Sequence, residues 1–180
     1  MSRLIIITGD LASGKSSLAD SLSLRLNIPC FKKDVIKENL VDKYGFKTRE
    51  ENRALSIQAV DFMFDALKRF ASKNEDIILE ANFREEELLR LKDMSDFYQL
   101  DTELFVLRGD LEILYSRFLE RLPKRHVAHT SIHLEDSIER FSEYVLSQRM
   151  EIYPFIPHII DTTFKGNEEV FQISLKYLEK

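Results

Sequence analysis

Apolar and polar positions follow two alternating patterns along the chain. Short runs of consecutive apolar residues, as in 4–7 and 104–107, predict strands that are covered on both faces. Between these runs, apolar residues recur every three or four positions, which is typical of helices that bury one face. The predicted strands cover residues 4–8, 28–32, 76–81, 102–108 and 158–161. The predicted helices cover residues 16–26, 34–43, 49–73, 85–97, 111–122, 134–153 and 167–178.

This alternation of strands and helices indicates βαβ units, which form a parallel sheet with right-handed crossovers. Asp110 is the expected N-cap of the helix at 111–122, and Pro154 ends the helix at 134–153. With 180 residues, of which 44% are hydrophobic, the chain is long enough for one domain with a substantial core. Residues 123–130 are polar, basic and without periodicity, so we expect a mobile loop or lid there.

Composition and charge narrow the classes of function. The formal net charge is −5, which disfavours a general nucleic-acid binder because such proteins usually present a basic surface. The one cysteine, Cys30, lies in an apolar segment and is expected to be a buried structural thiol. No apolar run approaches the roughly 20 residues of a membrane span, and the first predicted strand begins at residue 4, which leaves no room for a signal peptide. We therefore expect a cytoplasmic protein with no membrane partner.

The most specific motif lies between the first predicted strand and the first predicted helix. Residues 9–16 match the P-loop pattern G-x-x-x-x-G-K-S in the strand–loop–helix setting that this pattern requires. Its glycines allow backbone N–H groups to surround a phosphate at a helix N-terminus. Lys15 is expected to contact the β- and γ-phosphates of ATP, and the Ser16 hydroxyl to ligate Mg²⁺. The predicted nucleotide-binding residues of this loop are Gly9, Asp10, Ala12, Ser13, Gly14, Lys15, Ser16 and Ser17.

The order of parts along the chain resembles the P-loop kinases of small molecules, a group that includes gluconate kinase, chloramphenicol phosphotransferase and the zeta-toxin kinases. Chains with such a P-loop also resemble the AAA-family ATPases. The matching parts are 9–17, 33–34, 79–83, the arginines at 117, 121 and 125, and 161–163. The resemblance implies a three-layer α/β P-loop NTPase fold. Its five-stranded parallel sheet has the order 2-3-1-4-5, as in nucleoside monophosphate kinases, with a lid at approximately 117–133.

Two acidic residues follow predicted strands at the edge of the sheet where open parallel sheets bind ligands. The resemblance implies that Asp34 orients the acceptor hydroxyl and accepts its proton. Asp34 is also suited to be the N-cap of a helix that begins at Val35. For Glu80, the resemblance implies a contact with a Mg²⁺-bound water or with the acceptor. The alternative is a carboxylate paired with a basic neighbour.

Three arginines recur at a four-residue spacing, which places them on one helix face if the helix continues. A guanidinium matches the charge that spreads over a phosphoryl group during its transfer. The resemblance implies that Arg117 and Arg121 close over the nucleotide, with Arg125 in the lid near the acceptor. The alternative is a solvated face that pairs with acidic residues.

Four further residues are candidate contacts at the edges of the site. Asn82 and Arg84 directly follow the third predicted strand and are within reach of an acceptor, although an ordinary loop role is equally compatible. The resemblance implies that Thr162 and Thr163, after the last strand, lie beside the adenine.

Three histidines, His126, His129 and His133, invite comparison with a metal site. Zinc requires a defined fourth ligand and a rigid frame, and neither is evident in a polar segment without cysteine. We therefore expect no metal at the histidines.

Together these patterns predict a kinase that transfers the γ-phosphate of Mg-ATP to a hydroxyl of a small molecule, acting as a monomer or homodimer. One alternative is a polynucleotide 5′-hydroxyl kinase, which the acidic charge disfavours. The other is a regulatory nucleotide-binding ATPase whose output is a conformational change. The predicted catalytic residues are Lys15, Asp34 and Arg121. The predicted metal ligands are Ser16 and Glu80, and the predicted acceptor contacts are Asp34, Glu80, Asn82, Arg84 and Arg125.

Overall fold

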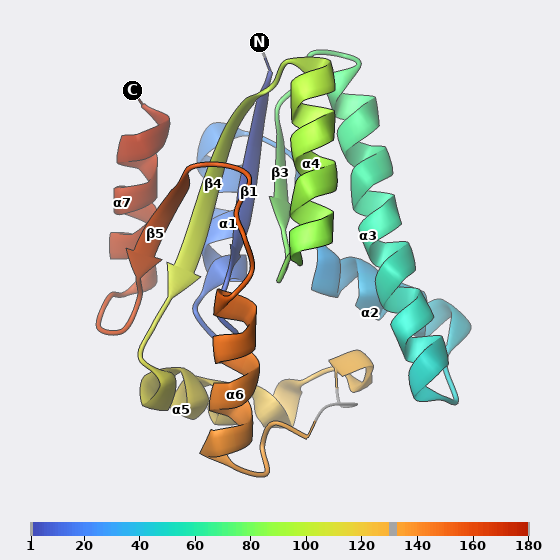
Figure 1. The fold of residues 1–180 in the computed structure, drawn as a ribbon, viewed down its shortest axis with the longest axis vertical. Helices are drawn as coiled ribbons and strands as arrows, with labels where there is room; N and C mark the ends of the chain where they lie inside the picture. Colours follow the sequence, from blue (N-terminus) through green and yellow to red (C-terminus); the bar gives the residue numbers. More distant parts are fainter. Residues whose placement is uncertain (1, 130–132, 180) are drawn as a thin grey trace.

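The computed structural model describes residues 2–129 and 133–179. Thr130 and the remainder of 130–132, which belong to the predicted lid, therefore lie outside the described residues. Five parallel strands form one sheet in the order β2-β3-β1-β4-β5, which confirms the predicted fold class (Figure 1). The strands are β1 (Arg3–Gly9), β2 (Cys30–Lys32), β3 (Ile77–Glu80), β4 (Asp101–Arg108) and β5 (Pro157–Asp161). The α-helices are α1 (Lys15–Leu26), α2 (Lys33–Tyr44), α3 (Arg49–Ala71), α4 (Glu85–Tyr98), α5 (Leu111–Arg121), α6 (Ile138–Arg149) and α7 (Asn167–Leu178).

Helices cover both faces of the sheet, as the uninterrupted apolar runs predict. Leu4 and Ile6 of β1 pack toward α3 and α4. Ile5 and Ile7, which alternate with them, pack toward α1 and α7. All four side chains are fully buried. Two separate cores therefore hold the sheet between two helical layers (Figure 1).

A third core lies beyond the carboxyl ends of the strands, where α5 and α6 are placed in Figure 1. Leu114 and Phe118 of α5 pack against Phe141 and Val145 of α6. Ala12 of the P-loop belongs to the same cluster. The pair of helices that flanks the lid is therefore packed directly on the P-loop.

Several helix boundaries differ from the predicted ones, most of all for α6. The prediction of a helix over 134–153 was wrong at both ends, because α6 runs only from Ile138 to Arg149. Its N-cap is Ser137, whose side chain accepts a hydrogen bond from the Arg140 N–H at 3.2 Å. Beyond its C-terminus, the Glu151 carboxylate accepts a hydrogen bond from the first backbone N–H of α4 at 2.8 Å, a contact that a continued helix would change.

Two other boundaries bear on the site. Helix α2 begins at Lys33, so Asp34 lies in its first turn and is not its N-cap, in contrast to the alternative above. Helix α5 begins after Asp110, whose carboxylate caps it by accepting from two backbone N–H groups as predicted. It ends at Arg121, before a 3-10 turn over Leu122–Lys124 that includes Pro123. A second 3-10 turn covers Val127–His129.

Candidate active site

The P-loop joins the carboxyl end of β1 to the first turn of α1. Gly9 has φ 122°, and a Cβ there would lie 2.1 Å from the Leu107 carbonyl oxygen of β4, so only glycine fits. Gly14 at the start of α1 has φ 92°. The loop is closed internally by Ser13, whose hydroxyl donates to the Asp10 carbonyl oxygen at 2.7 Å. These contacts form a curved backbone that leads into a helix N-terminus, which is the geometry that binds phosphate.

Lys15 lies inside this curve and is almost fully buried. Its Nζ donates to the Asp10 carbonyl oxygen at 2.6 Å. Burial lowers the pKa of Lys15, and the negative charges of Glu80, Asp34 and Asp10 oppose that shift. A buried ammonium group with several carboxylates nearby is held at the point where the strands end.

Glu80 and Ser16 face each other next to Lys15. The Ser16 hydroxyl donates to Glu80 Oε2 at 3.2 Å, which connects the first turn of α1 to the end of β3. Glu80 is buried, and this burial raises its pKa, while the neighbouring Lys15 charge lowers it. Hydroxyl and carboxylate oxygens are ligands that Mg²⁺ prefers, so this pair is chemically suited to the metal.

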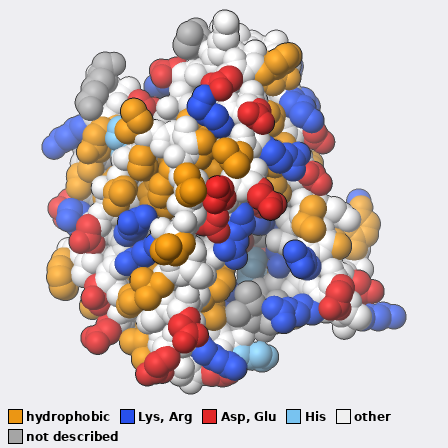
Figure 2. Space-filling model, viewed as in Figure 1, with side chains coloured by type: hydrophobic (Ala, Val, Ile, Leu, Met, Phe, Trp, Pro, Cys, Tyr) orange, Lys and Arg blue, Asp and Glu red, His pale blue; other side chains and the backbone are white. Residues whose placement is uncertain are grey.

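Asp34 reaches the same site from the first turn of α2. Its charge acts on the pKa of Lys15, Glu80 and Lys37, which places it among both the buried pair and the basic residues of α2. Lys, Arg and His side chains gather around a hollow on the face of the molecule drawn in Figure 2. The structure thus brings Asp34 close enough to Lys15 and Glu80 for its charge to affect both pKa values.

A pocket of ≈ 240 Å³ opens beside the P-loop, on the side of α7. Arg117 and Arg121 of α5 line it, opposite the segment that follows β5. Arg117 donates to the carbonyl oxygens of Thr162 and Thr163, at 2.9 Å each, and so fixes this segment against α5. The complete lining consists of Ala12, Ser13, Gly14, Leu18, Arg117, Arg121, Thr162, Lys165, Gly166, Asn167 and Val170. Its position next to the phosphate loop fits the nucleoside part of a nucleotide.

The hydroxyl groups of the two threonines after β5 are both hydrogen-bonded to neighbouring residues. Thr162 Oγ1 donates to the Arg108 carbonyl oxygen at 3.0 Å. Thr163 Oγ1 donates to Asp161 at 2.6 Å and accepts from the Asp110 N–H. Of the two residues, only Thr162 lines the pocket.

The described segment at Val127–His129, part of the predicted lid, lies against α2 and α3. Lys37 Nζ and Asn52 Nδ2 both donate to the carbonyl oxygen of Ala128, at 2.9 and 3.1 Å, and Ala128 is fully buried. His129 Nε2 lies 2.9 Å from Glu38 Oε1. The segment at 127–129 is thus connected to helices that lie about ninety residues earlier in the sequence.

Arg125 lies between the 3-10 turn at Leu122–Lys124 and the segment at Val127–His129, within the range where the sequence predicts a lid. Its guanidinium lies over the Phe118 ring, 4.9 Å from the centroid. Burial lowers the pKa of Arg125, whereas the charges of Asp34 and Glu135 oppose that shift. Arg125 therefore reaches toward Asp34 from the lid side.

Some predicted site residues are committed elsewhere. Arg84 is exposed at the N-terminus of α4 and forms an ion pair with Glu151 at 3.0 Å, so it is directed toward the segment after α6.

Asp10 also has its N–H, its carbonyl oxygen and its carboxylate hydrogen-bonded within the protein. Its N–H donates to the Leu107 carbonyl oxygen, its carbonyl oxygen accepts from Ser13 and Lys15, and its carboxylate accepts from Arg149 and from the Gly109 N–H.

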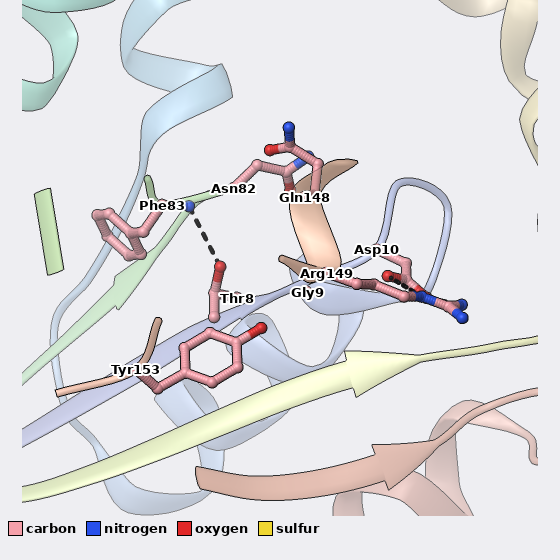
Figure 3. Close-up of a pocket in the computed structure, with 8 residues that line it drawn as sticks. All are labelled: Thr8, Gly9, Asp10, Asn82, Phe83, Gln148, Arg149 and Tyr153. Carbon is pink, nitrogen blue, oxygen red and sulfur yellow. Dashed lines mark hydrogen bonds and ion pairs between the residues drawn. The ribbon is translucent and has the colours of Figure 1, made fainter. Parts of the chain in front are cut away.

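Asn82 lines a second, much smaller pocket behind the P-loop (Figure 3). Its volume of ≈ 10 Å³ is enough for about one water molecule. Thr8 forms part of its floor and accepts a hydrogen bond from the Phe83 N–H at 3.2 Å. Gln148 and Arg149, at the end of α6, complete the opposite wall together with Tyr153. No local sequence pattern marks Gln148 or Arg149 as part of a site.

The histidines form separate contacts. His126 lies 3.0 Å from Asp42 and His129 pairs with Glu38, both on α2. His133 lies with Glu135 and Asp136 in an exposed group whose ligand atoms are within 4.8 Å of one another. Within 2–129 and 133–179, the three histidines therefore do not form one common ligand set.

The comparisons with known proteins agree with this architecture. The family model described as AAA domain matches residues 5–137, and the chain belongs to this family. No curated protein matches the chain. In the part of the chain that the structure describes, no helix is both long and apolar enough to cross a bilayer.

Solved structures of P-loop kinases share the fold over nearly the whole chain. A protein provisionally assigned as a kinase, from Chloroflexus aurantiacus J-10-fl, has a TM-score of 0.79 and 24% identity, with 99% of this chain and 96% of that chain covered. The APS kinase of Mycobacterium tuberculosis, in complex with AMPPNP and APS, has a TM-score of 0.64 and 16% identity, with 99% and 98% covered. Shikimate kinase from Aquifex aeolicus VF5 has a TM-score of 0.60 and 21% identity, with 98% and 96% covered.

Proposed function

We propose that the protein is an ATP-dependent kinase that transfers the γ-phosphate of Mg-ATP to a hydroxyl group of a small molecule. The observation that carries this proposal is the convergence of Lys15, Ser16, Glu80 and Asp34 at one edge of the sheet. This edge adjoins both the nucleoside pocket and the lid. Structural neighbours that are kinases of APS and of shikimate support phosphoryl transfer to small molecules.

The nucleotide is held by the P-loop and the adjoining pocket. Backbone N–H groups of the P-loop, from Ala12 to Ser17, surround the phosphates, while Arg117 and Thr162 border the nucleoside. Lys15 keeps one N–H on the Asp10 carbonyl oxygen and directs its other two to the β- and γ-phosphates. Ser16 and Glu80 are the residues that hold Mg²⁺, either directly or through water. The ion neutralises phosphate charge when it is bound.

Transfer requires a base and a cover. Asp34 accepts the proton of the acceptor hydroxyl while the hydroxyl oxygen attacks the γ-phosphorus. The bond between the γ-phosphorus and the oxygen that bridges to the β-phosphate then breaks, which releases ADP. Arg121 and Arg125 stabilise the negative charge on the transferring group. The lid excludes water, which otherwise competes with the acceptor for the phosphoryl group.

The experiment that tests the proposal is ADP release from Mg-ATP, with and without a pooled panel of hydroxyl compounds. Lys15→Met serves as the blank, because it removes the ammonium group and keeps most of the side-chain volume. We expect release that depends on one acceptor and that falls by about 10² or more in the variant. ATP binding without acceptor-dependent release, for the full panel and for a 5′-hydroxyl oligonucleotide, would contradict the kinase assignment and favour a regulatory nucleotide switch.

A further inference from the structure

Arg149, the last residue of α6, reaches the P-loop from a position 139 residues away in the sequence. Its Nε donates to Asp10 Oδ1 at 3.1 Å and its Nη2 donates to Asp10 Oδ2 at 2.6 Å. The same Nη2 donates to the Gly109 carbonyl oxygen at 2.5 Å. This forked arrangement on one carboxylate is the strongest geometry that a guanidinium adopts. Figure 3 shows Arg149 extended toward Asp10 along the edge of the small pocket.

Asp10 needs this partner because its side chain is only 2% exposed. The Gly109 N–H supplies a further hydrogen bond to its carboxylate at 3.0 Å. The hydrogen bond with Asp10 raises the pKa of Arg149, so the guanidinium stays charged opposite the carboxylate. A buried charge that loses its partner is strongly destabilising, whereas removal of both charges together is often nearly neutral.

Asp10 also accepts a hydrogen bond from Lys15. Its carbonyl oxygen accepts the Lys15 Nζ at 2.6 Å and the Ser13 hydroxyl at 2.7 Å. The position of this carbonyl is therefore set on one side by the P-loop and on the other by Arg149. Helix α6 follows the predicted lid in the chain. Arg149 therefore connects α6 to Asp10, the residue whose carbonyl oxygen accepts from Lys15.

We propose that Arg149 is a positioning residue of the nucleotide site, which acts through the Asp10 carboxylate to hold the start of the P-loop and Lys15 in the geometry that binds phosphate. Arg149 contacts Asp10 and Gly109 and does not itself need to touch the nucleotide. This assignment rests on the proposed function, since it deepens the account of the same site.

The test compares three variants of the full chain. Arg149→Met removes the fork and keeps the side-chain length. The double variant Asp10→Asn/Arg149→Met removes both buried charges. Arg140→Met is the matched control, because Arg140 lies on the same helix with a 61% exposed side chain and pairs with Asp136 four residues away. For each protein we would measure the thermal midpoint, the Kd for Mg-ADP by calorimetry, and hydrogen exchange of the amides at 9–16.

We expect Arg149→Met to raise the Kd for Mg-ADP by about tenfold, in the range usual for coupling between sites, and to speed exchange in the P-loop. The double variant should regain the wild-type thermal midpoint but neither the affinity nor the slow exchange, because asparagine leaves the loop without its link to α6. Arg140→Met should match the wild type in all three measurements.

Either of two results would overturn the assignment. One is an unchanged Kd and unchanged P-loop exchange in Arg149→Met. The other is a double variant that recovers affinity and slow exchange together with stability, which would make the pair purely structural. Should Arg149→Met not fold, the double variant decides between these results. If the wild type does not bind Mg-ADP, the proposed function fails, and hydrogen exchange alone still tests the positioning role of Arg149.

Discussion

The P-loop and the lid border the same site, yet different parts of the chain hold them in place. In the P-loop, the Asp10 carbonyl oxygen accepts from Ser13 and Lys15, which are only three and five residues away. In the lid, the Ala128 carbonyl oxygen accepts from Lys37 and Asn52, which are 91 and 76 residues away. The Lys15 and Ser13 contacts of the P-loop are therefore local in sequence, although Arg149 and Gly109 also bind the Asp10 carboxylate from 139 and 99 residues away, whereas the contacts to the Ala128 carbonyl oxygen come from distant helices.

This difference predicts that substitutions on the two sides affect nucleotide binding and phosphoryl transfer differently. A substitution in the P-loop should weaken nucleotide binding itself. A substitution on the side of α2 and the lid should leave the nucleotide bound but impair transfer, because we propose that those residues surround the acceptor and not the phosphates of the ground state.

The largest separation of binding from transfer is expected for Asp34→Asn. The amide cannot accept the acceptor proton, so we expect the rate of transfer to fall by about 10²–10⁴. The Kd for Mg-ATP should stay close to the wild-type value, because Asp34 lies on α2 and not in the P-loop. Calorimetry and single-turnover transfer in parallel would measure the two quantities. If affinity for Mg-ATP and the rate of transfer fell by equal factors, Asp34 would act on nucleotide binding, and the proposed difference between the two sides would be wrong.

Arg121→Met should have the next largest effect. Arg121 lines the pocket beside the P-loop that we propose holds the nucleoside, and its charge is close enough to lower the pKa of Lys15, although burial is the main cause of that shift. We expect the turnover at saturating Mg-ATP to fall by about 10²-fold, the usual loss for one group that stabilises transition-state charge. Arg140→Met, on the exposed face of α6, is the control. An unaltered turnover in Arg121→Met would mean that this arginine only borders the pocket.

The pH dependence of transfer should report Glu80. Burial raises the pKa of Glu80, so its carboxylate takes up a proton at a higher pH than an ordinary glutamate. Since the ionised form is the one proposed to hold Mg²⁺, the rate should decline on acidification earlier than a glutamate with a pKa near 4.3 would allow. Values of kcat/KM for Mg-ATP, which report ionisation in the free enzyme, would measure this, with circular dichroism at each pH as a control for folding. A rate that stays constant down to the ordinary glutamate range would contradict the assignment.

The same shift has a consequence for stability with the opposite sign. A raised pKa in the folded state means that folding favours the protonated form of Glu80, so its contribution to stability grows as the pH falls through that pKa and is lost as the pH rises. Activity and stability should therefore change in opposite directions over this window, as far as Glu80 determines them.

The smallest effect is expected at Cys30 in β2, outside both regions. Burial and the nearby Glu80 charge raise the pKa of Cys30 to about 12, so its thiol should stay protonated and react slowly with iodoacetamide near neutral pH. Cys30→Ala should leave the Kd for Mg-ADP unchanged. The measurement is the alkylation rate of the folded protein relative to the protein in denaturant. Rapid alkylation in the folded state would contradict the buried structural role predicted from the sequence.

The sequence predicted elements best where their causes are local. The apolar runs of β1 and β4 identified strands that are covered on both faces. The N-cap role of Asp110 was confirmed. The prediction for α6 was wrong at both ends, because Ser137 caps the helix later and Glu151 is bound to the N-terminus of α4. The apolar periodicity extends over the whole segment and therefore predicts neither of these contacts.

The sequence by itself determined the order of strands and helices, the phosphate loop and the acidic residues after the strands, since short-range spacing and motif context set these features. The tertiary structure decided what each charged side chain meets. It bound Asp10 to Arg149, turned Arg84 toward Glu151, and docked Ala128 on α2 and α3. Those contacts join residues that are 67 to 139 positions apart, and such pairs form only when the packing of the cores has fixed the helices in space.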